Sequence, residues 1–295
     1  MNGLSKNVVI WHLGWNISGV RRNERWLLDA IVEAGISFFV KQFEPDLVLG
    51  VLPRIKQWLR LRMASNDFYR RQPAGFVGCG SVSRAAVKQI IPDTAFISVP
   101  TPNILWEESV KQIDSPYIVF VDESMDYSPD AKLLGLSVSD DLENYYLRMN
   151  ELFREVEDIL GCSVIIAASG KYHYTEDRFN GRELIYGQTL SLIQHASLVI
   201  GHYSAALNQA VVNRKTILRL SDSSFQKYQQ YIIQIGVHYI GSPPFLSDDL
   251  ESIRESVMQH VVDDSKAIEI ESMYFREPGV QGDYREIIKQ AFLSL

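Results

Sequence analysis

The segment that decides the fold is GRELIYGQTLSLIQHASLVIGHYSAALNQAVVNRKTILRL, residues Gly181 to Leu220. Its apolar runs alternate with amphipathic stretches, which predicts a helix, a buried strand, a tight loop, a second helix and a second strand. The first strand ends at Ile200, and Gly201 breaks it. The second helix is expected over Ala205 to Val212, with Ser204 in its first turn. A strand that leads into a helix in this way is typical of an α/β domain.

The loop between that strand and that helix carries polar groups that suit an anion. Unpaired N–H groups in the first turn of a helix, together with the positive end of its dipole, favour a phosphate. The hydroxyl of Ser204 adds one more donor, and His202 lies beside it. The sequence leaves a second interpretation open, in which Ser204 only caps the helix and His202 is satisfied within the loop.

Strands and helices alternate along the whole chain, which predicts parallel sheets covered by helices on both faces. We expect an α/β fold with two Rossmann-like lobes and a cleft between them, the first lobe spanning residues 1–115 and the second residues 116–295. A basic surplus in the first lobe and an acidic surplus in the second support this division. The expected strands are 7–12, 37–40, 46–50, 94–99, 117–121, 163–168, 198–200 and 216–220, and the expected helices are 25–34, 141–160, 205–212, 248–262 and 283–293.

Composition narrows the class of protein. The chain has 295 residues, of which 46% are hydrophobic and 22% charged, as expected for a globular protein. Its net charge of −7 argues against a general nucleic-acid binder. No apolar run approaches the ~20 residues that a membrane-spanning helix needs, and the first residues lack the apolar core of a signal peptide. We therefore expect a cytoplasmic protein.

Two further patterns are weak signals. Cys79 and Cys162 are far apart, without the spacing of a zinc site or a disulfide framework, so both are interpreted as small buried residues. The stretch Gly75 to Ser83, GFVGCGSVS, is similar to a dinucleotide-binding glycine turn, but its third glycine is replaced by serine. No long apolar strand precedes it and no acidic residue follows at the expected place, so NAD binding is not predicted.

A basic amphipathic helix is expected in the first lobe, over Pro53 to Met63, PRIKQWLRLRM. Such a helix can rest on an anionic membrane surface or face an anionic acceptor. It can equally pack Trp58 and Leu61 on its own sheet and leave its basic face in solvent. The sequence does not choose between these arrangements.

Polar side chains follow two more of the expected strands in the second lobe. Asp122 and Glu123 come directly after the strand 117–121, where a carboxylate can act as a general base, a nucleophile or a metal ligand. Because the carboxyl ends of parallel strands share one edge of a sheet, the loops at Asp122, Ser169 and Gly201 should converge there. Asp122 and Glu123 are therefore the candidate catalytic residues.

The loop after the strand 163–168 and the segment just before the helix at Thr189 supply candidate phosphate contacts. Gly170 lets backbone N–H groups approach a ligand, Lys171 brings positive charge, and Ser169 precedes both. An ordinary turn with a solvent-exposed lysine is the alternative interpretation. Arg182 can clamp a phosphate, or it can pair with Glu183 at the surface.

Four stretches taken together resemble a known family: YIVFVDESMDYSPD, YYLRMNELFREVE, VIIAASGKYHY and the segment 181–220. They are similar, in order and spacing, to bacterial lipopolysaccharide and capsule biosynthesis glycosyltransferases of GT-B arrangement, in particular to the sialyltransferase-like group. The resemblance covers about residues 116–220. In the first hundred residues only the general α/β character is shared.

The resemblance implies transfer of a sugar from a nucleotide-sugar donor to a glycan or lipid-linked glycan acceptor of a surface polysaccharide, with peripheral contact at the inner membrane. It implies that His202 and Ser204 contact the donor phosphate, that Arg182 and Thr189 line the donor site, and that Asp122 or Glu123 lies near the chemistry. No cofactor is implied beyond the nucleotide-sugar substrate.

Three departures from the family pattern keep other functions open. Ser169-Gly170 stands where the family has an HP pair, Ser128 replaces the histidine of an HPD element, and Ala205 replaces the second hydroxyl of an HxST element. These replacements favour a non-catalytic subunit that binds a nucleotide sugar. A sugar-nucleotide epimerase or hydrolase is a further alternative.

Positive charge at the departing phosphate can come from a helix N-terminus together with Arg182, Lys171 and His202. Because the sequence has no DxD-type pair at a strand end, we expect a reaction that requires no metal ion.

Overall fold

The structure is a computed structural model. It describes residues 75–90, 92, 95–101, 113, 115–125, 127, 139, 141–170, 172–259 and 262–294. The expected elements before residue 75, the basic helix Pro53 to Met63 included, lie outside the described residues. The chain divides into two units, one made of Trp106–Ile270 and the other of Met1–Leu105 with Glu271–Leu295.

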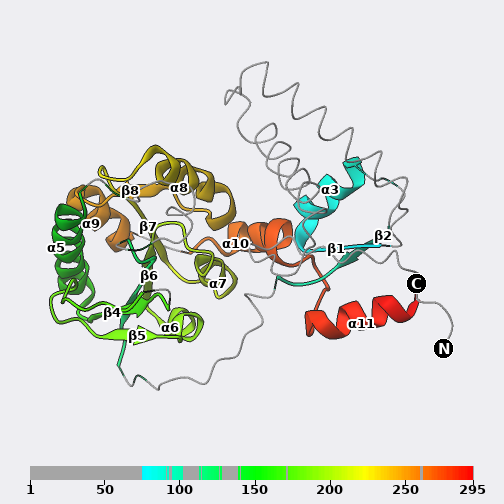
Figure 1. The fold of residues 1–295 in the computed structure, drawn as a ribbon, viewed down its shortest axis with the longest axis horizontal. Helices are drawn as coiled ribbons and strands as arrows, with labels where there is room; N and C mark the ends of the chain where they lie inside the picture. Colours follow the sequence, from blue (N-terminus) through cyan, green and yellow to red (C-terminus); the bar gives the residue numbers. More distant parts are fainter. Residues whose placement is uncertain are drawn as a thin grey trace, which may run out of the picture. The chain divides into compact units, whose positions relative to one another are not determined.

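The larger unit is built on a six-stranded, all-parallel sheet (Figure 1). The strands lie in the order β5-β4-β3-β6-β7-β8, which is the strand order of a doubly wound Rossmann sheet. Their bounds are β3 Ile118–Val121, β4 Val164–Ala168, β5 Leu184–Tyr186, β6 Leu198–Gly201, β7 Ile217–Ser221 and β8 Pro244–Leu246. The α/β class and this Rossmann-like lobe follow from the topology itself.

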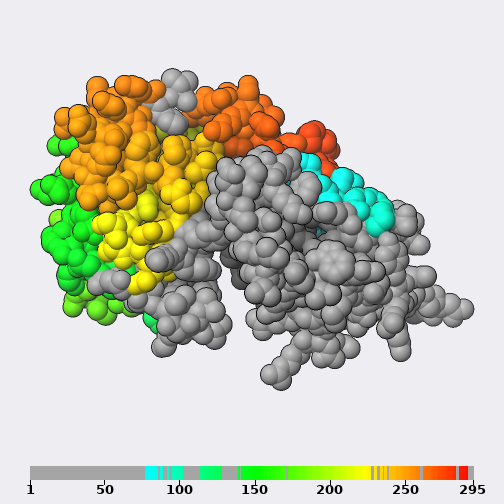
Figure 2. Space-filling model, turned by 90° about the horizontal axis from the view of Figure 1, so that it is seen from above, coloured from blue at the N-terminus to red at the C-terminus, as the bar shows by residue number. Residues whose placement is uncertain are grey.

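Helices cover both faces of this sheet. Helix α5 (Leu142–Leu160) packs with α9 (Leu250–Gln259), and α6 (Thr189–His195), α7 (Leu207–Val212) and α8 (Lys227–Ile240) pack in series (Figure 1). The space-filling view shows α9, in orange, against the green of α5 at the surface (Figure 2). No helix among the described residues is long and apolar enough to cross a membrane.

The core of this unit lies between α5 and the central strands. All four residues of β3 are buried, as a continuous apolar run in a parallel sheet predicts. The ring centroids of Phe120 and Phe153 are 5.1 Å apart, and each fully buried side chain of this kind contributes ~1.5–3 kcal/mol. Asp141 caps the start of α5, and Gly161 ends it in the left-handed conformation, φ 65°.

The smaller unit holds a parallel pair of strands, β1 (Gly75–Gly78) and β2 (Ala95–Ser98), with α3 (Gly80–Ile90) between them in sequence. The C-terminal segment packs here through the π-helical η2 (Glu271–Phe275), which contacts α3. Thr101 N–H donates to Phe275 O, and Arg84 pairs with Glu277 at 2.5 Å. The sequence analysis placed residues 271–295 in the second lobe, whereas the larger unit ends at Ile270.

The glycine stretch 75–83 itself forms strand β1 and the start of α3, and the residues that precede it lie outside the described part of the chain. Gly80 adopts φ 71°, and a Cβ there would overlap the backbone carbonyl of Met273. The absence of a side chain at position 80 therefore allows η2 to pack closely against the start of α3. Both cysteines are free thiols; Cys79 is buried and Cys162 is partly buried.

Candidate functional site

The strand order of the larger unit places a topological switch point between β3 and β6. From β3 the chain moves outward to β4 and β5, then crosses back so that β6 lies on the other side of β3. In doubly wound sheets, ligands bind beyond the carboxyl ends of the strands at such a point. The loops after β3 and β6 are therefore the first place to look for a site.

Glu123 joins these two loops. Its Oε1 atom accepts a 2.8 Å hydrogen bond from Tyr203 N–H. Its Oε2 atom is buried and has no hydrogen-bond partner among the described residues. Burial raises the pKa of Glu123 to about 8, against the lowering effect of the Tyr203 N–H. The side chain can thus gain or lose a proton near neutral pH.

Asp122, the neighbouring carboxylate, has a different environment. Its Oδ1 atom accepts from Ser124 N–H at 2.9 Å and from the Tyr174 hydroxyl at 2.9 Å, and its Oδ2 atom accepts from Ser169 N–H at 3.2 Å. Three donors hold this buried side chain in one orientation. The loops after β3, β4 and β6 thus converge as the strand pattern indicated, with Asp122 as the link to β4 and Glu123 as the link to β6.

The helix that follows the loop after β6 is shorter than expected. Helix α7 begins at Leu207 rather than Ala205, and Leu207 N–H donates to Ser204 O at 3.0 Å. Ser204 Oγ accepts from Ala206 N–H at 3.3 Å. Ser204 is only partly buried and lies in the turn before the helix. It belongs to the same loop as Tyr203, whose N–H contacts Glu123.

His202 lies in the interior of the unit. Its Nδ1 atom is 3.0 Å from Leu220 O, and its Nε2 atom is 3.0 Å from the Tyr145 hydroxyl. Because the carbonyl can only accept, Nδ1 carries the proton and Nε2 accepts from Tyr145. Burial lowers the pKa of His202 to about 4, so the ring is neutral. Both ring nitrogens are hydrogen-bonded within the core. The His202 side chain therefore anchors the loop to the core and does not face solvent.

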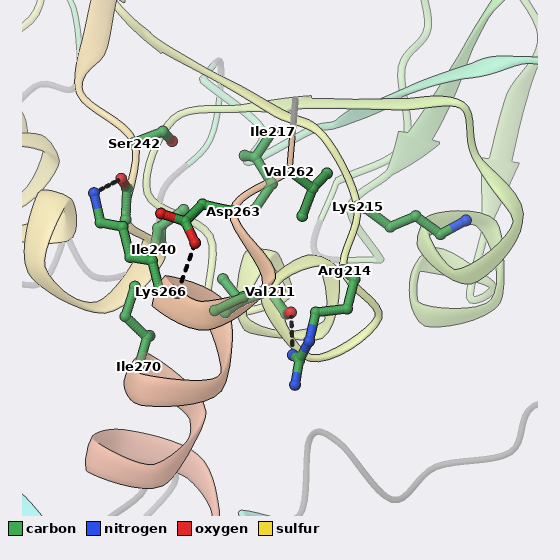
Figure 3. Close-up of a pocket in the computed structure, with 12 residues that line it drawn as sticks. Val211, Arg214, Lys215, Ile217, Ile240, Ser242, Val262, Asp263, Lys266 and Ile270 are labelled. Carbon is green, nitrogen blue, oxygen red and sulfur yellow. Dashed lines mark hydrogen bonds between the residues drawn. The ribbon is translucent and has the colours of Figure 1, made fainter. Parts of the chain in front are cut away.

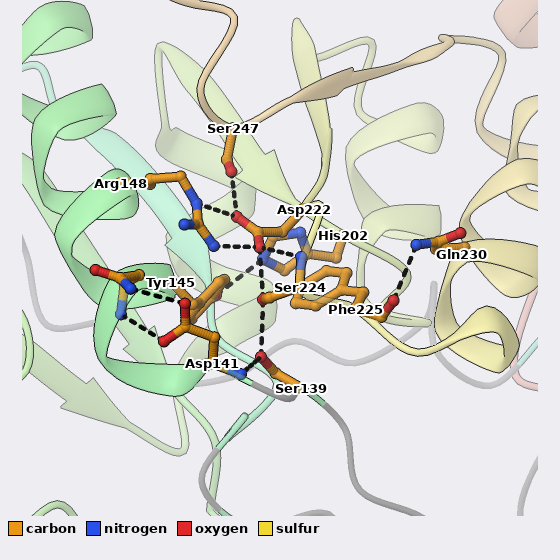
Figure 4. Close-up of polar contacts among 11 residues, drawn as sticks. Ser139, Asp141, Tyr145, Arg148, His202, Asp222, Ser224, Phe225, Gln230 and Ser247 are labelled. Atoms are coloured by element: carbon orange, nitrogen blue, oxygen red, sulfur yellow. Dashed lines mark hydrogen bonds and ion pairs between the residues drawn. The ribbon is translucent and has the colours of Figure 1, made fainter.

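An ion pair between the buried Asp222 and the partly exposed Arg148 lies next to His202 at the end of β7 (Figure 4). Arg148 Nη2 is 2.6 Å from Asp222 Oδ1, and its Nε donates to Oδ2 at 2.9 Å. Ser224 and Ser247 also donate to Asp222. The hydrogen bonds from Arg148 and the serines lower the pKa of Asp222 to about 2 although burial opposes this. The network ties α5 and the loop after β8 to the end of β7.

Arg219 is a fully buried cation on β7, and its register partner on β6 is Gly201. It donates to Ser242 O at 2.8 Å and to Ile233 O. Burial lowers its pKa to about 10. Gly236 of α8 makes room for the guanidinium, since a Cβ there would overlap Nη2.

Arg182 lies at the opposite edge of the sheet from Asp122 and Glu123. It forms a bidentate pair with Glu157, at 3.0 and 2.7 Å, and donates to Asn150 Oδ1 at 2.9 Å. Glu157 in turn accepts from Val164 N–H, at the start of β4. The structure therefore does not bring Arg182 together with the other candidate residues, and its expected partner Glu183 is replaced by Glu157.

The remaining candidates lie at the carboxyl edge or outside the described residues. Thr189 is the first residue of α6 and is partly buried. Ser169 donates its N–H to Asp122, and Gly170 is exposed, with open space where a Cβ would be. Lys171, together with Ser128 of the resemblance, lies outside the described residues.

A cavity of about 200 Å³ opens at the edge of the sheet opposite the switch point (Figure 3). Three cations line it, but each donates to a carbonyl at a helix end: Arg214 to Val211 O, Lys215 to Ala196 O and Lys266 to Gly241 O. In Figure 3 these side chains point in different directions. They cap the helices rather than converge on one anion.

Sequence reasoning missed four residues on the core side of the loop after β6, namely Tyr145, Arg148, Arg219 and Asp222. Their roles depend on burial and on partners distant in sequence. Asp222 alone offered a signal, as an acidic residue directly after an apolar strand. No group of three or more residues that could hold a metal ion occurs in the part of the chain that the structure describes.

No protein-family model matches the sequence, and no curated protein matches it significantly. Several solved structures are similar at low identity, and three of them are as follows. The glycosyltransferase SnogD from Streptomyces nogalater is 11% identical over 93% of this chain and 84% of that chain, with a TM-score of 0.41. MnaA from S. aureus, solved with UDP, is 10% identical over 95% and 82%, with a TM-score of 0.40. The spinosyn forosaminyltransferase SpnP is 11% identical over 89% and 66%, with a TM-score of 0.39. Similarities this distant assign no activity. The fold assignment therefore rests on the strand order.

Proposed function

We propose that the chain is a glycosyltransferase that moves a sugar from a nucleotide-sugar donor to a glycan acceptor. The observation that carries this proposal is the Glu123–Tyr203 contact at the switch point of a Rossmann-ordered sheet. It puts a carboxyl group of raised pKa beside a loop with backbone N–H groups and the Ser204 hydroxyl. A phosphate-binding loop next to a general base is what sugar transfer requires.

In this proposal Glu123 is the general base. Its carboxylate takes the proton of an acceptor hydroxyl as that oxygen bonds to the anomeric carbon of the donor sugar. The bond from that carbon to the phosphate oxygen breaks, and the nucleotide leaves with the electron pair. If configuration is retained, Glu123 acts instead as the nucleophile. Asp122, held by three donors, orients the loop that bears Glu123.

The donor phosphate is assigned to the loop Tyr203–Ala206. Ser204 supplies the hydroxyl contact there, and His202 positions the loop from the core side through Tyr145 and Leu220. Lys171, in the loop after β4, is kept as a further source of positive charge. We propose that no metal ion is required; loss of turnover in a chelator, restored by Mn²⁺, would contradict this.

The acceptor is proposed to be a surface polysaccharide of lipopolysaccharide or capsule type, met at the cytoplasmic face of the inner membrane. Support for this comes from the sequence resemblance over residues 116–220 and from the basic stretch Pro53 to Met63. Sedimentation of the full chain with vesicles containing anionic lipid tests the membrane contact. Binding that is lost when Arg54, Lys56, Arg60 and Arg62 are changed to Ser would support it, and absence of binding would contradict it.

A thermal-shift panel of CMP, UDP, GDP, dTDP and their sugars tests the donor site. A nucleotide that binds only the native state raises the melting temperature. We expect one nucleotide class to stabilise the protein, with the shift reduced in Ser204→Ala and unchanged in Ser252→Ala, which changes a partly exposed residue of α9. No shift with any nucleotide would overturn the proposal.

A non-catalytic donor-binding subunit is the second candidate, favoured by Ser169-Gly170 and Ala205 at positions where the family carries a histidine and a hydroxyl. A selective thermal shift without transfer to any glycan acceptor would point to it. Release of free sugar from the donor alone would instead point to a hydrolase.

A further inference from the structure

The loop to which the donor phosphate is assigned already holds a carboxyl group of the protein itself. Glu123, which follows β3, accepts a 2.8 Å hydrogen bond from Tyr203 N–H through its Oε1 atom. The N–H group of Ser204 acts on the same carboxyl group and lowers its pKa, as the Tyr203 N–H does. Successive backbone N–H groups of this kind are the donors that a phosphate oxygen uses. The Glu123 side chain therefore occupies the place proposed for the phosphate.

The carboxyl group of Glu123 is poorly stabilised in that place. Its Oε2 atom is buried and has no hydrogen-bond partner among the described residues. Burial and the charge of the neighbouring Asp122 raise its pKa to about 8, although the two N–H groups and the charge of Arg219 lower it. A buried carboxylate oxygen without a partner is costly, so a ligand that moves this side chain removes an unfavourable interaction.

We propose that the donor phosphate displaces the Glu123 carboxylate from the Tyr203 N–H, and that this displacement frees Glu123 to act on the acceptor hydroxyl. The loop after β6 then binds one oxyanion at a time, either the carboxylate of the protein or the phosphate of the donor. Glu123 is thus occupied until the donor arrives. This inference rests on the proposed function for the identity of the ligand as a nucleotide sugar.

Competition between the two groups couples donor binding to the proton on Glu123. The ionised carboxylate accepts strongly from Tyr203 N–H and repels a phosphate, whereas the neutral carboxyl group is a weaker acceptor without charge. Donor affinity should therefore be highest below about pH 8 and should fall above it. By reciprocity the bound donor raises the pKa of Glu123 further, so kcat should level off at a higher pH than kcat/KM.

Apart from Asp122, the charged and titratable groups that act on Glu123 keep one state near neutral pH. Arg219 of β7 remains a cation, because burial lowers its pKa only to about 10. Burial raises the pKa of Tyr145 on α5 and of Tyr239 on α8, so both hydroxyl groups stay neutral. A change in donor affinity centred near pH 8 therefore reports Glu123.

Isothermal titration calorimetry with the full-length protein tests this competition. The probes are UDP-glucose, GDP-mannose, dTDP-glucose and CMP-N-acetylneuraminate, whose phosphate esters stay fully ionised throughout, and inorganic pyrophosphate, which carries the anion without a nucleoside. We expect at least one nucleotide sugar to bind the wild type about tenfold more weakly at about pH 9.5 than at about pH 6.5.

Two variants remove the competing charge. At about pH 9.5, Glu123→Gln should bind that nucleotide sugar about tenfold more tightly than the wild type, with little dependence on pH. Glu123→Ala, which also removes the acceptor oxygen, should bind it at least as tightly. Glu255→Gln removes one negative charge from an exposed position of α9 and is the matched control, which should behave as the wild type.

The outcomes separate this inference from the proposed function. Nucleotide-sugar binding that is unchanged or weaker in both Glu123 variants would overturn the competition and leave the donor site in place. If no nucleotide sugar binds, pyrophosphate decides: tighter binding in the Glu123 variants than in the wild type supports the competition and refutes the proposed function alone. Pyrophosphate that binds none of the proteins, or binds all of them equally, would then refute both.

Discussion

Glu123 and Tyr203 are joined by a 2.8 Å hydrogen bond across the point at which the sheet reverses its winding. The carboxyl group follows β3, and the N–H group that it accepts from follows β6. The two strands are neighbours although their loops are 80 residues apart in the chain. The contact places an ionisable side chain of raised pKa on the loop to which we assign the donor phosphate.

The pH dependence of transfer should report Glu123. Because burial raises its pKa to about 8, the base form grows as the pH rises. We expect kcat/KM to increase about tenfold per pH unit below that value and to level off above it. Glu123→Gln should lower kcat by about 10²–10⁴-fold. Glu155→Gln, at an exposed pair with Arg254, is the control and should keep the wild-type profile. A flat profile between about pH 6 and pH 8 would exclude Glu123 as the base.

Tyr145→Phe should destabilise the fold through His202. The substitution removes the hydroxyl that donates to Nε2 and leaves a buried acceptor unsatisfied, which costs ~1–3 kcal/mol of unfolding free energy. Urea unfolding measures the loss. Leu147→Ala, on the exposed face of the same helix, should change the unfolding free energy by less than about 0.5 kcal/mol. Equal stability of Tyr145→Phe and the wild type would contradict the assigned hydrogen bond.

Asp222→Asn should both destabilise the protein and change its acid sensitivity. Breaking a fully buried ion pair from one side costs about 3–5 kcal/mol, and the cost here should be smaller because the Arg148 side chain is 20% exposed. The native pKa of about 2 lies below the unfolded value of 3.8, so the stabilisation is present above pH 3.8 and is lost as the pH falls toward 2. The variant should lack this component in unfolding curves measured from neutral to acid pH. An unchanged acid limb would show that Asp222 is not held as the structure has it.

Gly236→Ala should be destabilising although alanine is the better helix former. Helix propensity alone would favour alanine by about 1 kcal/mol, but the new methyl group meets the Arg219 guanidinium. Overpacking of this kind costs ~1–3 kcal/mol. Gly170→Ala, at an exposed glycine with open space around it, is the control and should be close to neutral. A stabilised Gly236→Ala would indicate that Arg219 adopts another conformation.

Sequence reasoning predicted the four central strands of the larger unit to within one residue at each end. Their uninterrupted apolar runs are long enough to be distinguished, as Val164–Ala168 illustrates. The edge strands β5 and β8 were missed because three residues give no periodicity, and Pro244 begins β8. Helix α8 was missed as well, since its interior holds Gly236 and several β-branched residues, which are weak helix formers.

The candidate site was predictable only in part. Parallel sheets could be anticipated from the alternation of strands and helices, so the convergence of the loops at Asp122, Ser169 and Gly201 followed from the sequence. The directions of the His202 and Arg182 side chains could not be predicted from the sequence. They depend on the partners Tyr145 and Glu157, which no local sequence pattern reveals. The identity of a polar residue in the sequence does not show whether its side chain faces a ligand or the core.

Hydrogen–deuterium exchange with the nucleotide selected by thermal shift tests the central claim most directly. If the donor phosphate binds the loop after β6, the amides of Tyr203 to Ala206 should exchange more slowly with nucleotide than without it, and this protection should weaken in Ser204→Ala. Protection confined to residues 262–270, beside the cavity at the opposite edge, would contradict the account.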